Sequence, residues 1–129
     1  MPLVTISVLS GRTVSEKQAL SGAIHDALIE AFKIPADDYN HRIAEYDAAN
    51  FLRPPGKSDR YVLVEMTVFP GRSAAAKANL YKGIVDRLER LGIPRFDVLI
   101  VLNEPPMANW GVRGGLPGDS VDIGFKLTI

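Results

Sequence analysis

Pro2 is the residue whose chemistry depends most on its place in the chain. If Met1 is removed, Pro2 presents a secondary amine at the head of a predicted strand, where it can act as a base or a nucleophile. Burial there disfavours the charged amine and lowers its pKa toward neutrality, and a nearby arginine lowers it further. Such an amine takes up and returns a proton at physiological pH. If Met1 stays attached, the nitrogen is an amide, and the proline is only a well-tolerated first residue of a strand.

Two arginines occupy matching places in the chain. Arg12 and Arg72 each follow a glycine at the end of a predicted strand, and each precedes a threonine or serine that opens a predicted helix. The guanidinium group is a rigid, permanently charged fork that suits a carboxylate, and the N–H groups of a helix N-terminus add donors for an anion. A solvated turn residue is the alternative, but the repeated placement favours anion binding, with Arg72 ahead of Arg12.

Three further side chains are candidates for a site. Asp38 lies just past the first predicted helix, beside Tyr39, where a carboxylate can serve as a general acid or activate water. The alternative for Asp38 is a helix cap or a solvated charge. Trp110 lies in a glycine-bearing loop near the C-terminus, where it either walls a pocket or anchors a small satellite core.

Metal and cofactor motifs are missing from the sequence. The chain has two histidines and no cysteine, and the histidines have no close ligand spacing such as H-x-x-x-H, so no metal site is predicted. We interpret His25 as a partly buried spacer on the first helix and leave His41 open. The sequence holds no G-x-S-x-G elbow, P-loop or dinucleotide-binding glycine motif.

Size and composition indicate one small globular domain over residues 1–129. Lys plus Arg and Asp plus Glu both number 15, which gives zero formal charge and no broad positive field for nucleic acid or anionic lipid. The apolar fraction of 47% and the charged fraction of 23% are typical of folded domains. No apolar run approaches the ~18 residues of a membrane span, and the N-terminus does not resemble a secretory signal. We therefore expect a cytoplasmic protein with neither nucleic-acid nor membrane partners.

The chain resembles itself. Residues 4–13 match residues 64–73 through an alternating apolar run that ends in Gly-Arg-Thr or Gly-Arg-Ser, and the match continues through Leu20 and Leu80 along the helices. Two amphipathic segments can share Leu and Ile by chance, but chance explains the repeated Gly-Arg turns poorly. The sequence therefore predicts an internal repeat of about 2–49 and 61–103, followed by a C-terminal loop and short strand within 104–129.

Each half reads as a strand, a helix and a second strand. Strands are predicted over 3–9, 41–47, 61–69 and 97–103, helices over 14–33 and from Ser73 to about residue 91, and a last short strand over 121–125. Thr13 and Glu16 fit a capping box at the start of the first helix. Gly92 and Pro94 end the second helix.

These elements predict an α/β (α+β) fold. Because β-α-β units are parallel and right-handed, two units related by a pseudo-twofold form a four-stranded sheet with both helices on one face. The other face carries apolar side chains that are too numerous to stay exposed: Leu3, Leu9, Leu63, Phe69, Leu99 and Val101. We therefore expect copies of the chain to associate through this face.

Taken together, the chain resembles the tautomerase superfamily of the 4-oxalocrotonate tautomerase type. The resemblance rests on Pro2 heading a strand, the two Gly-Arg turns that open the helices and the duplicated β-α-β plan, and it extends through residues 34–38 and 109–111. The duplicated form of this length most resembles the branch that contains malonate semialdehyde decarboxylase. The resemblance implies a homotrimer with sheets facing inward, an active site without cofactor, and the amino-terminal proline as catalytic residue.

Position by position, the resemblance implies catalytic roles for Pro2, Asp38 and Arg72. Arg72 is also implied to bind the carboxylate of a small substrate, and we add Arg12, Tyr39 and Trp110 as further substrate-binding candidates: Trp110 matches the family's loop tryptophan, and Tyr39 is a possible donor to the developing enolate.

The sequence departs from the decarboxylase pattern at two positions. Pro70 stands where the decarboxylase has a second substrate-binding arginine, and Val112 replaces a phenylalanine. The loss of one guanidinium puts decarboxylation of a β-keto acid in doubt, although Arg12 or Arg113 is a possible substitute.

The predicted function is that of a cofactor-independent tautomerase acting on small 2-oxo or enol acids, in which Pro2 moves a proton between carbon and oxygen. The nearest alternative is a decarboxylase or hydratase of the malonate semialdehyde type, in which Pro2 is a protonated acid. A second alternative, from another class, is a trimeric binding module that keeps the fold without catalysis.

Overall fold

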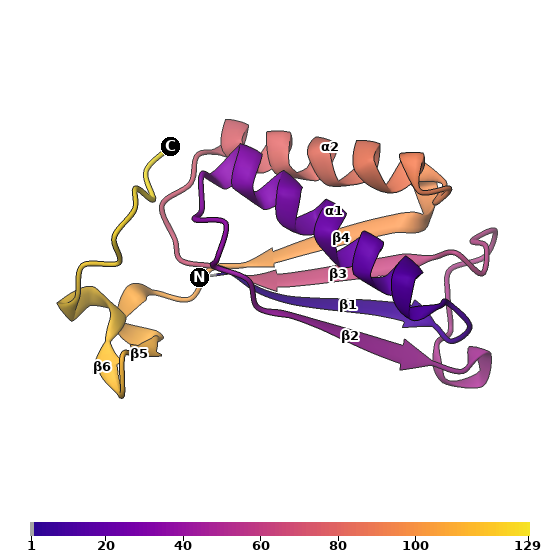
Figure 1. Ribbon diagram of the computed structural model, residues 1–129, viewed down its shortest axis with the longest axis horizontal. Helices are drawn as coiled ribbons and strands as arrows, with labels where there is room; N and C mark the ends of the chain where they lie inside the picture. The colour runs from indigo at the N-terminus through magenta and orange to yellow at the C-terminus, as the bar shows by residue number, and fades with distance from the viewer. Residues whose placement is uncertain (1) are drawn as a thin grey trace.

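Both long helices of the protein lie on one face of a four-stranded sheet (Figure 1). The structure, a computed structural model, describes residues 2–129. The main elements are β1 (Leu3–Leu9), α1 (Val14–Phe32), β2 (His41–Tyr46), β3 (Val62–Thr67), α2 (Ala74–Arg90) and β4 (Val98–Asn103). The predicted pair of β-α-β units with both helices on one side of the sheet is confirmed.

The pairing of the strands determines which chain segments meet at each end of the sheet. The strand order is β2-β1-β3-β4. Strands β1 and β2 are parallel, as are β3 and β4, whereas the central pair β1–β3 is antiparallel, with Leu3 opposite Thr67. The start of β1 therefore lies at the same end of the sheet as the start of β2 and the C-terminal end of β3.

The two Gly-Arg turns place the helix starts in the same way. Gly11 and Gly71 have φ angles of 123° and 128°, which residues with a Cβ rarely adopt. The Thr13 hydroxyl accepts a hydrogen bond from the Glu16 N–H at 3.1 Å, and the Glu16 carboxylate accepts one from the Thr13 N–H, which confirms the capping box. Ser73 caps α2 through the same hydroxyl contact, to the N–H of Ala76.

The core lies between the helices and the sheet. Its apolar side chains come from the alternating inner positions of β1 and β3 and from the predicted stripes of the two helices, and the largest of them include Ile6, Leu20, Ile24, Leu28, Phe32, Met66, Leu80, Ile84 and Leu88. Within residues 2–129, no helix is long and apolar enough to cross a membrane.

The outer face of the sheet is less exposed than predicted. Leu99 and Val101 in β4 expose 50% and 40% of their surface. Leu9 and Phe69 were also expected on an open surface, but both are buried. The ring of Phe69 is covered by the indole of Trp110, with the ring centroids 4.6 Å apart. Of the six apolar side chains predicted for this face, the exposed ones are therefore those of β4.

The C-terminal segment differs from its prediction. It forms a small hairpin of β5 (Gly111–Val112) and β6 (Leu116–Pro117), with positive φ angles at Arg113, Gly114 and Gly115 in the turn. The short strand predicted over 121–125 is wrong. The side chains there do alternate between half-buried and exposed, but the segment pairs with no strand among the described residues. The half-buried positions are Val121, Ile123 and Phe125, which line the cavity described below.

Candidate active site

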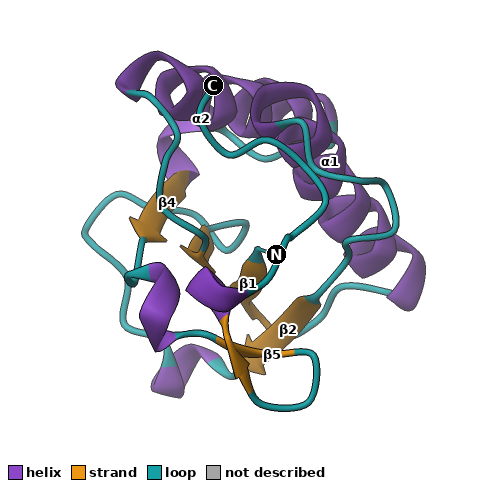
Figure 2. Ribbon diagram, turned by 90° about the vertical axis from the view of Figure 1, so that its left-hand side faces the viewer, coloured by secondary structure: helices purple, strands orange, loops and turns teal. Residues whose placement is uncertain are grey.

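Three of the predicted site residues lie at one end of the sheet, onto which Figure 2 looks. Pro2 is buried immediately before β1. Arg72 follows β3, whose last residues lie opposite the first residues of β1. Asp38 precedes β2, which runs parallel to β1 and starts at the same end. The antiparallel pairing of β1 with β3 thus brings segments that are far apart in the sequence to one place.

A cavity of about 550 Å³ opens at this end of the sheet. Its lining comprises Leu3, Pro35, Asp38, Phe69, Trp110, Gly111, Val112, Arg113, Val121, Ile123 and Phe125. Asp38 and Arg113 are the charged residues among these, and most of the others are apolar. Charges act more strongly on one another beside apolar walls than in bulk water, because the local dielectric constant is lower.

Arg72 is buried behind the cavity wall, with only 6% of its surface exposed. Its Nη1 donates a hydrogen bond to the carbonyl oxygen of Phe69 at 3.2 Å, and its guanidinium carbon lies 4.7 Å from the ring centroid of Phe32 and 5.9 Å from that of Phe125. Its Nε is buried without a hydrogen-bond partner. Burial lowers the pKa of Arg72, and the carboxylates of Glu104 and Asp38 partly offset this effect. Because Arg72 is buried, the alternative that it is a solvated turn residue is excluded.

Trp110 serves both of the purposes that the sequence left open. Its indole packs edge-on against Phe69 and lines the cavity. Its Nε1 donates a hydrogen bond to the carbonyl oxygen of Pro105 at 3.2 Å, which fixes the orientation of the ring. Trp110 is therefore both a pocket wall and an anchor of the C-terminal segment.

Asp38 and Tyr39 are neighbours in the chain but point to different surroundings. Asp38 lines the cavity and interacts electrostatically with Arg72. Tyr39 is not part of the cavity lining; it is 48% exposed, and its hydroxyl lies 2.7 Å from the hydroxyl of Ser21 on α1. Within one chain, the structure therefore does not bring Tyr39 to the candidate site.

Arg12 lies at the opposite end of the sheet, because it follows the C-terminal end of β1. Its Nη2 donates to the carbonyl oxygen of Arg60 at 3.1 Å, and burial together with the charge of Arg60 lowers its pKa. Within one chain Arg12 is thus separated from Pro2, contrary to its grouping with the substrate-binding residues. Arg113, the other arginine considered in the sequence, does line the cavity and donates to the carbonyl oxygen of Asp122.

Sequence reasoning missed a group of buried polar side chains next to this site. His25, predicted to be a partly buried spacer, is only 5% exposed, and it also makes a hydrogen bond to the backbone of the turn before β2. His41, at the start of β2, bonds Ser21 on α1. The signal available in the sequence was the presence of two histidines and a serine at positions where the second repeat has apolar or aromatic residues.

His41 makes folding stability sensitive to acid. Burial and the neighbouring His25 lower its pKa from 6.5 to about 4, so the unfolded chain binds a proton that the folded protein excludes. The free energy of unfolding is therefore expected to fall between pH 6.5 and pH 4 by roughly 1–2 kcal/mol from this group, allowing for solvent screening. Urea denaturation across this pH range should show a smaller decrease in the free energy of unfolding for His41→Asn than for the wild type. An equal decrease in the two proteins would contradict the lowered pKa of His41.

The described residues include no group of three or more His, Asp or Glu side chains that could hold a metal ion.

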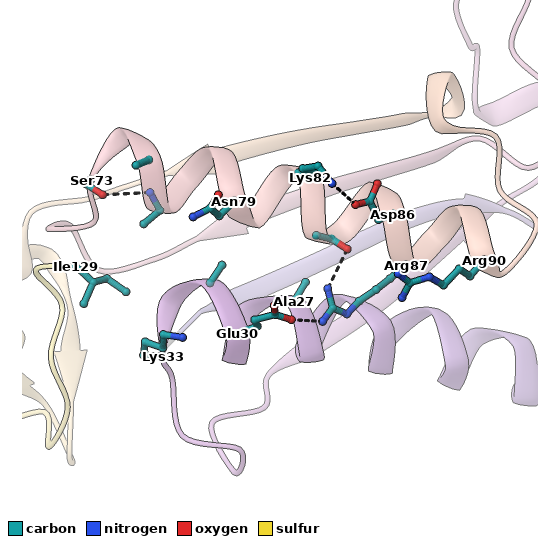
Figure 3. A pocket seen from close by; sticks show the side chains of 14 residues that line it. Ala27, Glu30, Lys33, Ser73, Asn79, Lys82, Asp86, Arg87, Arg90 and Ile129 are labelled. Carbon is teal, nitrogen blue, oxygen red and sulfur yellow. Dashed lines mark hydrogen bonds and ion pairs between the residues drawn. The ribbon is translucent and has the colours of Figure 1, made fainter.

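A larger hollow of about 890 Å³ lies over α1 and α2 (Figure 3). Four of its charged side chains form ion pairs: Arg87 with Glu30, and Lys82 with Asp86 at 2.6 Å. None of the predicted site residues lines it. The cavity at the start of β1 is therefore the better candidate for chemistry.

Comparison with known families matches both halves of the chain. Two family models, each described as a tautomerase enzyme, match residues 2–60 and 38–113. The probable tautomerase YusQ of Bacillus subtilis (strain 168) is 31% identical over 121 residues, which cover 89% of this chain and 95% of the relative. The probable tautomerase YrdN of the same organism is 27% identical, with coverages of 85% and 89%.

Solved structures agree with these relatives. A malonate semialdehyde decarboxylase superimposes with a TM-score of 0.80 at 29% identity, covering 87% of this chain and 92% of its own. A fused 4-OT that forms a symmetric trimer superimposes with a TM-score of 0.81 at 27% identity, covering 92% and 97%. With the family models, the relatives and the fold in agreement, the chain belongs to the tautomerase superfamily and is an enzyme of the isomerase class.

Proposed function

We propose that this tautomerase moves a proton between carbon and oxygen of small 2-oxo acids, with the amine of Pro2 as the proton carrier. The observation that carries the proposal is the position of Pro2, buried at the start of β1 at the end of the sheet where the cavity, Asp38 and Arg72 also lie. The proposal requires removal of Met1, which lies outside the residues that the structure describes.

The surroundings of Pro2 favour a neutral amine. A buried amine is poorly solvated when charged, and the guanidinium of Arg72 at the same end of the sheet disfavours a second positive charge. We expect both effects to bring the amine toward the range in which it can accept a proton from carbon and return it to oxygen, or the reverse.

Arg72 is proposed to attract and hold the substrate carboxylate. It is a buried cation behind an apolar cavity wall, and its Nε has no hydrogen-bond partner. An anion in the cavity therefore meets a weakly screened positive charge. Asp38, at the cavity wall, is proposed to assist the chemistry at the reacting end of the substrate.

The enzyme is proposed to work as a homotrimer. Apolar side chains of β4 face away from the helices and stay exposed, at 50% for Leu99 and 40% for Val101, and the fused 4-OT relative forms a trimer. Burying such a surface against other copies stabilises the assembly without any further partner.

Val101→Glu is expected to weaken this assembly, because it places a charge in the surface that the subunits would bury. Light scattering coupled to gel filtration should report a smaller mass for Val101→Glu than for the wild type. Val14→Glu is the matched control, since Val14 is 66% exposed on α1, away from the sheet. A wild type that is already monomeric, or a trimer that tolerates Val101→Glu, would contradict the proposed interface.

A decarboxylase or hydratase of the malonate semialdehyde type is the second candidate, favoured by the similar solved structure and by Asp38 at the cavity wall. In that enzyme Pro2 would act as a protonated acid. The two candidates differ in their dependence on pH: kcat/KM should rise through the pKa of Pro2 if the amine is a base and fall through it if the amine is an acid.

The test combines the mass of the mature chain with an assay. Intact-mass spectrometry of the untagged protein is expected to show a chain that begins at Pro2. That protein should ketonise phenylenolpyruvate or 2-hydroxymuconate, with kcat/KM rising to a plateau near neutral pH. A retained Met1, or release of carbon dioxide from malonate semialdehyde without any ketonisation, would contradict the proposal.

A further inference from the structure

Four polar side chains meet beneath the turn that leads into β2. Ser21 and His25 belong to α1, Tyr39 ends the turn and His41 begins β2. The Ser21 hydroxyl lies 2.7 Å from the Tyr39 hydroxyl and 2.9 Å from Nδ1 of His41, so one side chain of α1 contacts two residues of the following segment. We refer to these four residues as the α1–β2 network.

His25 holds the turn through its backbone. Its Nε2 lies 2.8 Å from the carbonyl oxygen of Ala36. A carbonyl oxygen only accepts, so Nε2 carries the hydrogen. Nδ1 of the same ring is buried without a partner, and a proton there would be a buried donor with no acceptor. The hydrogen bond from Nε2 to Ala36 is therefore the contact through which the ring holds the turn.

The rings of the network also contact one another. The ring of Tyr39 lies 4.0 Å from the centroid of His25 and 4.5 Å from that of His41, tilted by 35° and 45°. The polar groups that face His41 are those of Ser21, Tyr39 and His25, and none is a carboxylate. Hydrogen bonds and ring contacts thus attach residues 36–41 to α1 at several points.

Asp38 lies within the attached segment. Its N–H donates to the carbonyl oxygen of Pro35 at 3.1 Å, and the N–H of Tyr39 donates to that of Asp37 at 2.9 Å. Both Pro35 and Asp38 line the cavity. Helix α1 therefore contacts Ala36 through His25 and Tyr39 through Ser21, on either side of Asp38, which lines the cavity.

The second repeat shows that the fold does not need this network. Tyr81 and Val85 of α2 stand where Ser21 and His25 stand in α1, and Val98 and Ile100 of β4 take the places of Tyr39 and His41. Buried polar groups stabilise a protein less readily than apolar packing of the same shape. The polar side chains occur in the first repeat, whose turn before β2 borders the cavity.

We propose that His25, supported by Ser21, Tyr39 and His41, is a positioning residue that fixes the turn of residues 35–39 and thereby the carboxylate of Asp38 beside the cavity. The inference rests on the proposed role of Asp38 in the reaction. It extends the functional unit to a part of α1 that does not line the cavity.

The first test compares two substitutions of His25. His25→Leu removes the donor to Ala36, whereas His25→Gln keeps an N–H at a similar reach. Amide hydrogen exchange measured by NMR is expected to speed up at least about tenfold at Asp38 and Tyr39 in His25→Leu and to stay near the wild-type rate in His25→Gln. Unchanged exchange in a folded His25→Leu protein would overturn the proposal.

The second test asks whether His25 acts through Asp38. His25→Leu is expected to lower kcat/KM about tenfold in the wild-type background, because a displaced catalytic group reacts poorly. The same substitution should cost less than about twofold when Asp38→Asn is already present. An equal cost in both backgrounds would overturn the proposal.

A control variant and a substitute variant allow both tests to be interpreted. Ser58→Ala removes a partly buried contact to Asp97 at the other end of the sheet, so it should change neither the exchange of Asp38 nor kcat/KM. If His25→Leu does not fold, Ser21→Ala replaces it with the same expected results and the same contradicting ones. If the wild type converts none of the acids, the proposed function fails, and amide exchange alone decides whether His25 fixes the turn.

Discussion

The Pro2→Ala variant is expected to lose at least about a hundredfold in kcat/KM toward 2-oxo acids, the range that a positioned acid or base contributes. Alanine leaves a primary amine without the ring that holds the nitrogen at the start of β1. The strand itself begins at Leu3, so folding and assembly should not change. Steady-state kinetics, thermal unfolding and gel filtration of the two proteins measure these outcomes.

A second change separates the amine from the ring. A chain with one uncleaved residue ahead of Pro2 keeps the proline ring but turns its nitrogen into an amide, and it should be as inactive as Pro2→Ala. Wild-type rates in the extended chain would show that the amine is dispensable, whereas wild-type rates in Pro2→Ala would show that the ring is dispensable. A trimer with no activity even when the amine is free would instead favour a binding module that shares the fold.

Replacing Arg72 by methionine is expected to lower kcat/KM about 10- to 100-fold, mainly by raising KM, because the carboxylate loses its charged partner. Methionine fits the apolar space beside Phe32 and Phe125, and it removes the buried Nε that has no partner. The free energy of unfolding should therefore change by no more than about 1 kcal/mol. Steady-state kinetics and urea denaturation separate the two effects.

Arg12→Met is the matched variant for Arg72→Met, because Arg12 occupies the equivalent turn of the first repeat. It lies at the other end of the sheet, beside Arg60, and should cost less in kcat/KM than Arg72→Met. An equal loss in both variants would mean that Arg12 of one copy reaches the cavity of another, which would contradict its separation from the reaction.

The fold could be predicted because its determinants are local and occur twice. The Gly-Arg turns, the Thr13–Glu16 capping box and the alternating strands each act over a few residues. Because similar patterns occur in both halves, the elements predicted for one half support those predicted for the other. The matching boundaries of β1 and α1 follow from this redundancy. Pro2, Asp38 and Arg72 were grouped by a family resemblance, and their meeting at one end of the sheet agrees with that grouping.

The parts that could not be predicted depend on contacts between distant segments. Arg12 and Arg72 have the same local sequence, and only the antiparallel pairing of β1 with β3 separates them. The alternation in residues 121–125 is real, but it indicates contact with a cavity rather than pairing with a strand. The partners of His25 and His41 likewise depend on how α1 lies over the start of β2.

Because β1 and β3 are antiparallel, the two predicted repeats place their equivalent strand starts at opposite ends, or poles, of the sheet. Strand β3 starts at the pole of Arg12, as β1 starts at the pole of Arg72, and Val62 is the counterpart of Pro2. The nitrogen of Val62 is locked in a peptide link to Tyr61, so it can never be titrated. If Pro2 carries the proposed amine, each chain can therefore have it at one pole of the sheet alone, and the turn of Arg12 at the other pole is not constrained by that chemistry.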